Sequence, residues 1–169
     1  TTTPDEKDRV IVGNAQPRLT MGWDNKVTWK NWDLNLFFTG VFGQKIFNEP
    51  RAFYENPQMV RLGKNVLTSI SENQRASDPY AGKPSDRYLE DGSYFKLATA
   101  TLGYTFRNCF NGWLRDIRVY ASCNNVFTIT GYSGRDPEIC LGGLEPGHDS
   151  RNDHYPRTRQ FLVGATINF

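Results

Sequence analysis

Apolar and polar residues alternate along several stretches of the chain. In residues 160–169 every odd-numbered position is apolar, and the even-numbered positions are polar or small apart from Leu162. A period of two predicts a β-strand with one apolar face and one face that is mostly small or polar. The last residue of this stretch is the aromatic Phe169. Such a strand is typical of a transmembrane β-barrel.

The same alternation predicts further antiparallel strands along the chain. The expected strands cover about 18–29, 32–43, 93–106, 115–127 and 157–169. The first pair forms a hairpin around Lys30 and Asn31, and the register near Lys96 leaves room for a β-bulge. The connections at 44–92 and 128–156 are long, and the first has helical spacing of its apolar residues from roughly 57 to 73.

Short and long connections therefore alternate, as they do in outer-membrane barrels with short periplasmic turns and long extracellular loops. On this layout an aromatic girdle at one membrane interface is expected to contain Trp29, Trp32 and Trp113. The charged residues Asp24, Lys26 and Arg118 fall on the polar side of their strands, so we expect them to face the lumen. The predicted fold class is an all-β membrane protein, with about five strands of a large barrel and a partly helical extracellular loop.

A soluble β-sandwich, acting as a carbohydrate-binding module, is the alternative that shares this alternation. In a soluble sandwich the polar face of each strand would carry more charge, and a loop as long as 44–92 would be unusual. The net charge of +2 is too small to suggest nucleic acid as a partner. No signal peptide opens the sequence, so for an exported protein we expect the export signal on other residues and the chain to be a fragment.

Long motifs in the chain resemble the C-terminal end of SusC/RagA-type TonB-linked outer-membrane transporters. The motifs are D-R-V-I-V-G-N-A-Q-P-R-L-T, S-D-R-Y-L-E-D-G-S-Y-F-K-L-A-T-A-T-L-G-Y-T-F, N-N-V-F-T-I-T-G-Y-S-G-R-D-P-E-I and Y-P-R-T-R-Q-F-L-V-G-A-T-I-N-F. The resemblance implies a barrel of about 22 strands in the bacterial outer membrane, in contact with membrane lipid. It also implies import of oligosaccharides or, in some members, peptides.

The partners implied are the remaining barrel strands, a plug domain, TonB through an N-terminal part absent here, and a SusD-like surface lipoprotein that caps the extracellular mouth. The aromatic and aliphatic residues Phe161, Ile167 and Phe169 look like the strand signal that the barrel-assembly machinery reads in outer-membrane proteins generally. For Phe169, a role as an interface anchor is compatible with this signal.

The sequence contains no recognisable set of catalytic residues, and no cofactor is expected. His148, Asp149, Asp153 and His154 have metal-ligand side chains, but a flexible polar loop explains them better, so no metal is expected. An enzyme built on a barrel, with His148 and His154 in its site, remains a rival interpretation. The segment 133–138 favours a turn. Tyr132, Arg135 and Asp136 are nevertheless candidates for substrate or lid contact, because they suit ring stacking and hydroxyl binding.

Overall fold

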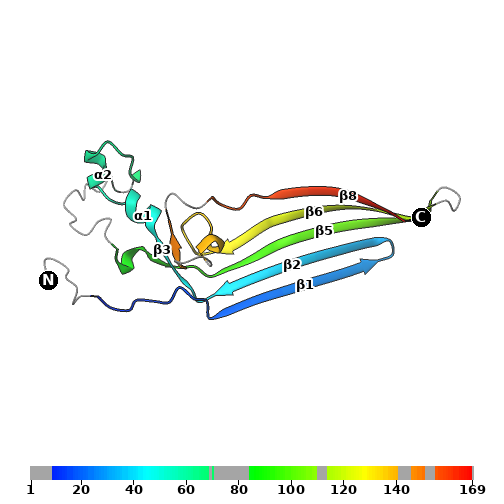
Figure 1. Cartoon of the computed structure of the whole chain (residues 1–169), viewed down its shortest axis with the longest axis horizontal. Coiled ribbons are helices and arrows are strands. Elements are labelled where there is room, and N and C mark those ends of the chain that lie inside the picture. Colours follow the sequence, from blue (N-terminus) through cyan, green and yellow to red (C-terminus); the bar gives the residue numbers. More distant parts are fainter. Residues whose placement is uncertain are drawn as a thin grey trace. The chain divides into compact units, whose positions relative to one another are not determined.

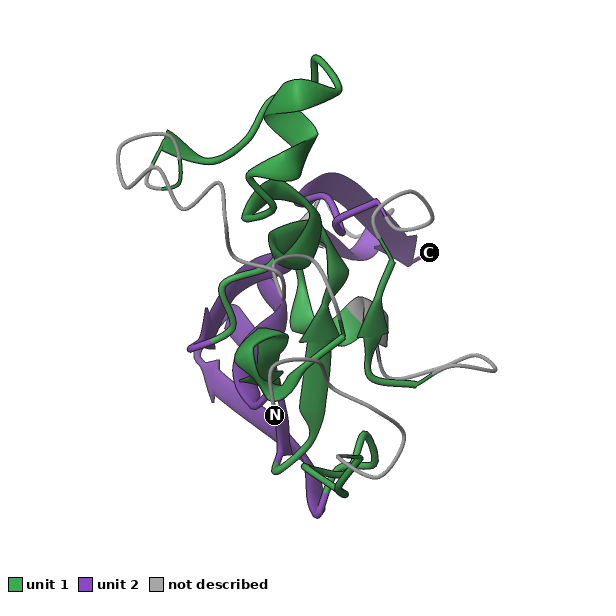
Figure 2. Cartoon of the chain, turned by 90° about the vertical axis from the view of Figure 1, so that its left-hand side faces the viewer, with its two compact units in different colours: residues 1–17, 43–92, 132–154 green, residues 18–42, 93–131, 155–169 purple. Residues whose placement is uncertain are grey.

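The computed structural model describes residues 9–68, 70, 84–109, 114–140, 146–150 and 155–168 of the 169-residue chain. The chain divides into two compact units (Figure 2). Unit 1 comprises residues 1–17, 43–92 and 132–154, and unit 2 comprises residues 18–42, 93–131 and 155–169. Unit 2 contains the long strands, whereas unit 1 contains the long connections between them.

Unit 2 is a five-stranded antiparallel sheet in the order β1-β2-β5-β6-β8 (Figure 1). The strands are β1 (Leu19–Trp29), β2 (Trp32–Phe42), β5 (Tyr94–Cys109), β6 (Leu114–Thr130) and β8 (Gln160–Asn168). The antiparallel five-stranded sheet expected from the alternation is therefore confirmed. The strand bounds differ from the expected ones by up to three residues.

The late start of β8 has a local cause at Asn125. This residue has a positive φ of 54°, which turns its backbone out of the ladder. Pairing between β6 and β8 accordingly stops at Asn124, which lies opposite Gln160. The Asn125 side-chain amide instead donates to the Thr158 carbonyl at 2.8 Å. The chain before Gln160 is thus held by a side chain and not by strand pairing.

The β-bulge that the sequence allows near Lys96 is present at Ala98. Against β2, Leu97 lies opposite Phe38 and Thr99 lies opposite the next residue, Phe37, so Ala98 is an extra residue. Against β6, Leu97 lies opposite Phe127 and Thr99 opposite Asn124. This extra residue changes the parity of β5, so that Leu97 lies on the same face as Ala100. The bulge therefore keeps the apolar residues of both halves of β5 on one side of the sheet.

Unit 1 contains a small sheet that the alternation along the chain does not predict. Its order is β4 (Leu89–Asp91), β3 (Lys45–Asn48) and β7 (His148–Asp149). β3 pairs antiparallel with β4 and parallel with β7. The backbone of Lys45 also donates to the carbonyl of Asn14 at 2.9 Å. Strands this short have no alternation long enough to be recognised in the sequence.

The helical segment expected at roughly 57–73 is interrupted, because residues 62–67 are not helical, and residues 69 and 71–73 lie outside the described residues. Unit 1 instead has α1 (Glu49–Tyr54) and α2 (Gln58–Arg61). Helix α2 ends in a Schellman motif, in which Lys64 donates to the Met59 carbonyl and Gly63, at a φ of 67°, donates to the Val60 carbonyl. None of the helices in the described ranges has the length and apolar character needed to cross a membrane.

Candidate functional site

The two faces of the unit 2 sheet differ sharply in chemistry, and we call them the apolar face and the polar face. The strand registers place apolar residues together on the first face, with Asn25 as the polar exception. The apolar face consists of Leu19, Met21, Trp23, Asn25, Val27 and Trp29 on β1; Trp32, Leu34, Leu36, Phe38, Gly40 and Phe42 on β2; Phe95, Leu97, Ala100, Leu102, Tyr104 and Phe106 on β5; Ile117, Val119, Ala121, Cys123, Phe127 and Ile129 on β6; and Phe161, Val163, Ala165 and Ile167 on β8.

Much of this apolar face is open to its surroundings. Trp23 is 53% exposed, Val119 is 40% exposed and Val163 is 78% exposed. A soluble sheet would bury such side chains in a core, because each large apolar side chain gains about 1.5–3 kcal/mol on burial. An open apolar face of this extent marks a membrane or protein contact surface.

Aromatic side chains gather at the end of the apolar face that carries the β1–β2 turn. Trp29 and Trp32 are register partners beside that turn, and Trp32 contacts Tyr104 edge-on with ring centroids 4.7 Å apart. Tyr104 in turn contacts Phe106 with ring centroids 4.7 Å apart. The structure thus brings together Trp29 and Trp32 of the expected girdle, whereas its third member, Trp113, lies outside the described residues, as does Phe169.

The polar face carries an ion pair that crosses a strand. Arg118 on β6 donates to both carboxylate oxygens of Asp33 on β2, through Nε at 2.9 Å and Nη2 at 2.5 Å. The strand between them, β5, contributes Gly103 at this point. A Cβ on Gly103 would lie 2.5 Å from Asp33 Oδ1 and 2.7 Å from Arg118 Nη2. A larger residue at this position would therefore force the ends of the paired side chains to shift.

Tyr120 extends this arrangement toward β8. The Arg118 guanidinium lies over the Tyr120 ring at 4.9 Å from its centroid, a cation–π contact. The Tyr120 ring lies against Gly164, where a Cβ would be 2.6 Å from the ring. Asp24 and Lys26 also lie on the polar face, opposite Phe37 and Asn35 of β2. The alternation along the strands predicts Arg118 on this face, whereas the role of Gly103 has no local signal in the sequence.

In unit 1 a buried carboxylate organises the second long connection. Asp149, whose side chain is 0% exposed, accepts a hydrogen bond from the Tyr132 hydroxyl at 2.7 Å and one from Arg135 Nη2 at 3.2 Å. Arg135 also donates to the Ser150 carbonyl at 2.7 Å. Tyr132 and Arg135, predicted as contact residues, are thus brought together by Asp149, which the sequence suggested only as a metal ligand. Tyr132 is buried, so its ring is not displayed for stacking.

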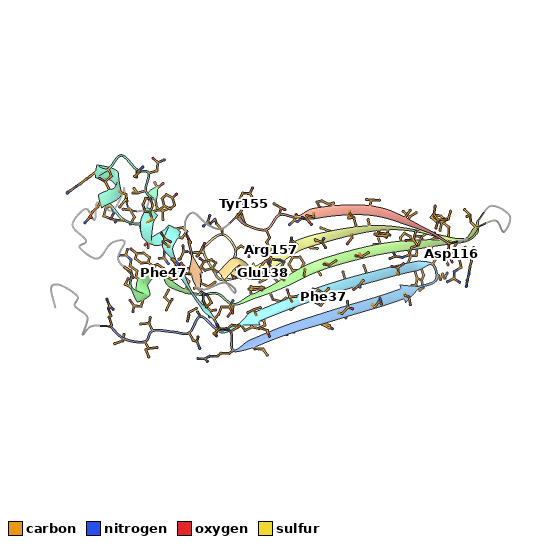
Figure 3. All side chains as sticks on the ribbon, in the orientation of Figure 1. Phe37, Phe47, Asp116, Glu138, Tyr155 and Arg157 are labelled. Atoms are coloured by element: carbon orange, nitrogen blue, oxygen red, sulfur yellow. The ribbon has the colours of Figure 1, made fainter. Side chains whose placement is uncertain are left out.

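Asp136, the remaining predicted contact residue, shapes its own turn. Its Oδ1 accepts a hydrogen bond from the Glu138 amide at 3.0 Å. This Asx turn precedes the short 3-10 helix at Pro137–Cys140. Glu138 is labelled in Figure 3. Within the described ranges no cluster of metal-ligating side chains is present, and Asp153 and His154 of the candidate metal set lie outside them.

A second carboxylate, Glu90, joins both long connections, and we call its contacts the Glu90 cluster. Glu90 Oε1 accepts from the Ser133 hydroxyl at 2.7 Å, from Arg51 Nη1 at 3.0 Å and from Asn48 Nδ2 at 3.2 Å. Glu90 Oε2 accepts from the Ser133 amide at 2.8 Å. Burial alone would raise the pKa of Glu90, but these hydrogen bonds outweigh it and hold the pKa below the ordinary value.

The chain is similar in sequence to TonB-dependent receptors. No family model matches it. It is 30% identical to the TonB-dependent receptor P3 of Formosa agariphila, over 96% of this chain and 17% of that protein. It is 26% identical to the TonB-dependent receptor SusC of Bacteroides thetaiotaomicron, over 99% of this chain and 17% of that protein.

The fold is similar to solved transporter structures. A chain of the RagAB peptide transporter matches with a TM-score of 0.70 and 26% identity, over 94% of this chain and 18% of that chain. The RagAB peptide importer in its open-open state matches with a TM-score of 0.69 and 25% identity, over 98% and 20% of the two chains. The chain thus spans 17–20% of the length of these relatives.

Proposed function

Because the chain belongs to the SusC/RagA type of TonB-dependent receptors, we propose that it forms part of the wall of an outer-membrane transporter that imports oligosaccharides or peptides. The observation that carries the proposal is the exposed apolar face of the unit 2 sheet, which is opposed by a polar face with paired charges. A barrel wall needs this arrangement, because one face meets hydrocarbon and the other meets a hydrated interior. The soluble β-sandwich does not account for the exposure of Trp23 and Val163.

The polar face would line the lumen, with Asp24, Lys26 and Arg118 pointing into it. Asp33 already neutralises the charge of Arg118, so this pair would form a fixed part of the wall with no net charge. Asp24 and Lys26 are the better candidates for contact with a plug domain or hydrated substrate, because both are exposed and neither contributes to the bidentate Asp33–Arg118 pair.

The long connections in unit 1 would lie on the extracellular side, where a SusD-like lipoprotein docks. The Glu90 cluster and the Asp149 contacts give these connections a defined shape. In that setting Tyr132 supports the loop from within. Arg135 is held by Asp149 and the Ser150 carbonyl, and the 35% of its side chain that is exposed would face a lid or substrate. The names of the RagAB structures support a peptide as one substrate class for this type of protein.

The assembly signal and the partners of the chain are proposed from its similarity to SusC/RagA-type receptors. Phe161, Ile167 and Phe169 would form the strand signal for the barrel-assembly machinery, and Phe161 and Ile167 lie together on the apolar face. The other barrel strands would pair with β1 and β8, and the plug and TonB would act through segments outside this chain. Transport needs no cofactor in this scheme.

A cysteine-labelling experiment on the intact transporter tests the assignment of the two faces. Val163→Cys lies on the apolar face, and Thr166→Cys lies on the polar face of the same strand, in a background in which Cys109, Cys123 and Cys140 are serine. A hydrophilic maleimide should label Thr166→Cys in detergent-free outer membranes and leave Val163→Cys unmodified. Equal labelling of both positions, or labelling of position 163 alone, would overturn the proposal.

A further inference from the structure

Basic side chains flank the aromatic cluster at the turn end of the apolar face. Lys30 forms the β1–β2 turn, and its Nζ lies over the Trp29 ring at 5.1 Å from the centroid. Arg115 on β6 is exposed and continues the row of Ile117 and Val119 on the apolar face. The rings of Trp32, Tyr104 and Phe106 lie between these cations along β2 and β5.

The backbone conformation of Lys30 is one that lysine seldom adopts. Its φ is 55°, in the left-handed region that glycine and asparagine adopt with the least strain. A tight turn between two strands commonly uses those residues at such a position. A non-glycine residue held at positive φ is a reason to look for a function of its side chain.

The carboxylates at this end of the sheet do not neutralise these cations on the apolar face. Among the described residues there, Asp33 and Asp116 lie on the polar face. Asp33 pairs with Arg118, and Asp116 accepts a hydrogen bond from Asn168 Nδ2 at 2.6 Å. Figure 3 labels Asp116 at this end of the sheet. The apolar face therefore ends in positive charge beside exposed aromatic rings.

We propose that Lys30 and Arg115 bind the phosphate groups of anionic phospholipids, with the acyl chains lying against Trp32, Tyr104 and Phe106. The proposal rests on the proposed function, because it requires the apolar face to meet lipid and the short turns to be periplasmic. The ligand is then a phospholipid such as phosphatidylglycerol in the periplasmic leaflet. Aromatic rings favour the level of the headgroups, and long basic side chains reach from apolar surface to the phosphates.

Native mass spectrometry of the intact transporter in detergent tests this inference directly. The probes are phosphatidylglycerol and phosphatidylcholine with identical acyl chains. The wild type should retain more phosphatidylglycerol. Lys30→Gln and Arg115→Gln should each weaken its binding about fivefold, which corresponds to about 1 kcal/mol per basic residue at a charged membrane surface. Binding of phosphatidylcholine should change much less.

Matched variants separate lipid binding from a loss of structure. Arg18→Gln removes one positive charge at the other end of β1, outside the aromatic cluster, and should leave phosphatidylglycerol binding at the wild-type level. Lys30→Arg and Arg115→Lys keep the charge and should retain the preference. The inference is overturned if the glutamine variants bind phosphatidylglycerol like the wild type, if Arg18→Gln loses as much, or if the charge-keeping variants lose it too.

The outcome is distinguishable from a failure of the proposed function. If the labelling of Val163→Cys and Thr166→Cys supports the barrel wall but the lipid preference is absent, only the lipid site is wrong. If the labelling fails, the wall itself is wrong, and lipid binding at Lys30 and Arg115 loses its basis.

Discussion

At the scale of single residues, large side chains on the polar face lie over glycines of the neighbouring strands. The Asp33–Arg118 pair spans Gly103, and the Tyr120 ring covers Gly164. Phe37, an apolar residue on this face that is labelled in Figure 3, lies against Gly22 with its ring 3.6 Å from a Cβ placed there. The glycines let these side chains lie flat along the sheet, so they cover the wall without extending far from it.

We predict that Gly103→Ala destabilises the sheet by breaking the ion pair. The added methyl group would meet both Asp33 and Arg118 at less than 3 Å, and loss of a partly exposed ion pair of this kind costs about 0–1 kcal/mol. Urea unfolding of the intact transporter in lipid vesicles measures the change in the free energy of unfolding. Gly131→Ala is the control, because a Cβ there has no neighbour within 4 Å. Equal stability of the two variants would contradict the role assigned to Gly103.

At the scale of elements, carboxylates tie together segments that are distant in sequence. Glu90 on β4 contacts Ser133, which follows β6, and Asn48, which caps α1 by accepting from the Arg51 amide at 2.9 Å. The parallel pairing of β3 with β7 joins the same connections; Phe47, labelled in Figure 3, lies on β3 opposite His148. The long connections are thus one folded unit and not separate loops.

The lowered pKa of Glu90 predicts a pH dependence for this unit. A carboxyl with a depressed folded-state pKa contributes stability that is fully present above its unfolded pKa of about 4.3. That contribution is lost as the pH falls through the lower folded-state pKa. The protection factor of the Ser133 amide, which compares its hydrogen exchange with that of an unstructured amide at the same pH, should therefore be high at neutral pH and should fall in acid as Glu90 becomes protonated.

Two variants define the test of this pH dependence. Glu90→Gln should give a low protection factor for the Ser133 amide already at neutral pH, with a smaller further change in acid. Glu138→Gln alters a carboxylate outside the Glu90 cluster and should exchange like the wild type. If Glu90→Gln kept the wild-type protection over the whole pH range, Glu90 would not be the group that holds Ser133.

At the scale of the whole molecule, the features that the sequence predicted are those with local signals. The strands of unit 2 were predictable because the alternation of apolar and polar residues and the tight turn are patterns of consecutive residues. The Glu90–Ser133 contact joins residues 43 positions apart, and Asp33–Arg118 joins residues 85 positions apart, so no local pattern reports them. The helix was overextended because Val60 and Leu67 have helical spacing, while the backbone turns at Gly63 between them.

The two edge strands of the unit 2 sheet determine how the chain should behave by itself. Among the residues that the structure describes, β1 and β8 of the unit 2 sheet each have a neighbouring strand on one side only. An unpaired strand edge in hydrocarbon leaves backbone groups without partners, and each such group costs several kcal/mol. In water the same chain would expose its apolar face, including Trp23 and Val163. The isolated 169-residue chain is therefore expected to be unstable as a monomer in either solvent.

Size-exclusion chromatography and circular dichroism of the isolated chain measure this directly. Without detergent the chain should aggregate, and in detergent it should lack the cooperative unfolding of a closed barrel, because β1 and β8 still lack their outer neighbours. Polar substitutions at Trp23 and Val163 should make it more soluble without giving it cooperative unfolding. A monodisperse, cooperatively unfolding monomer in plain buffer would instead require the apolar face to be buried within the chain, as in a sandwich, and the barrel-wall proposal would fall.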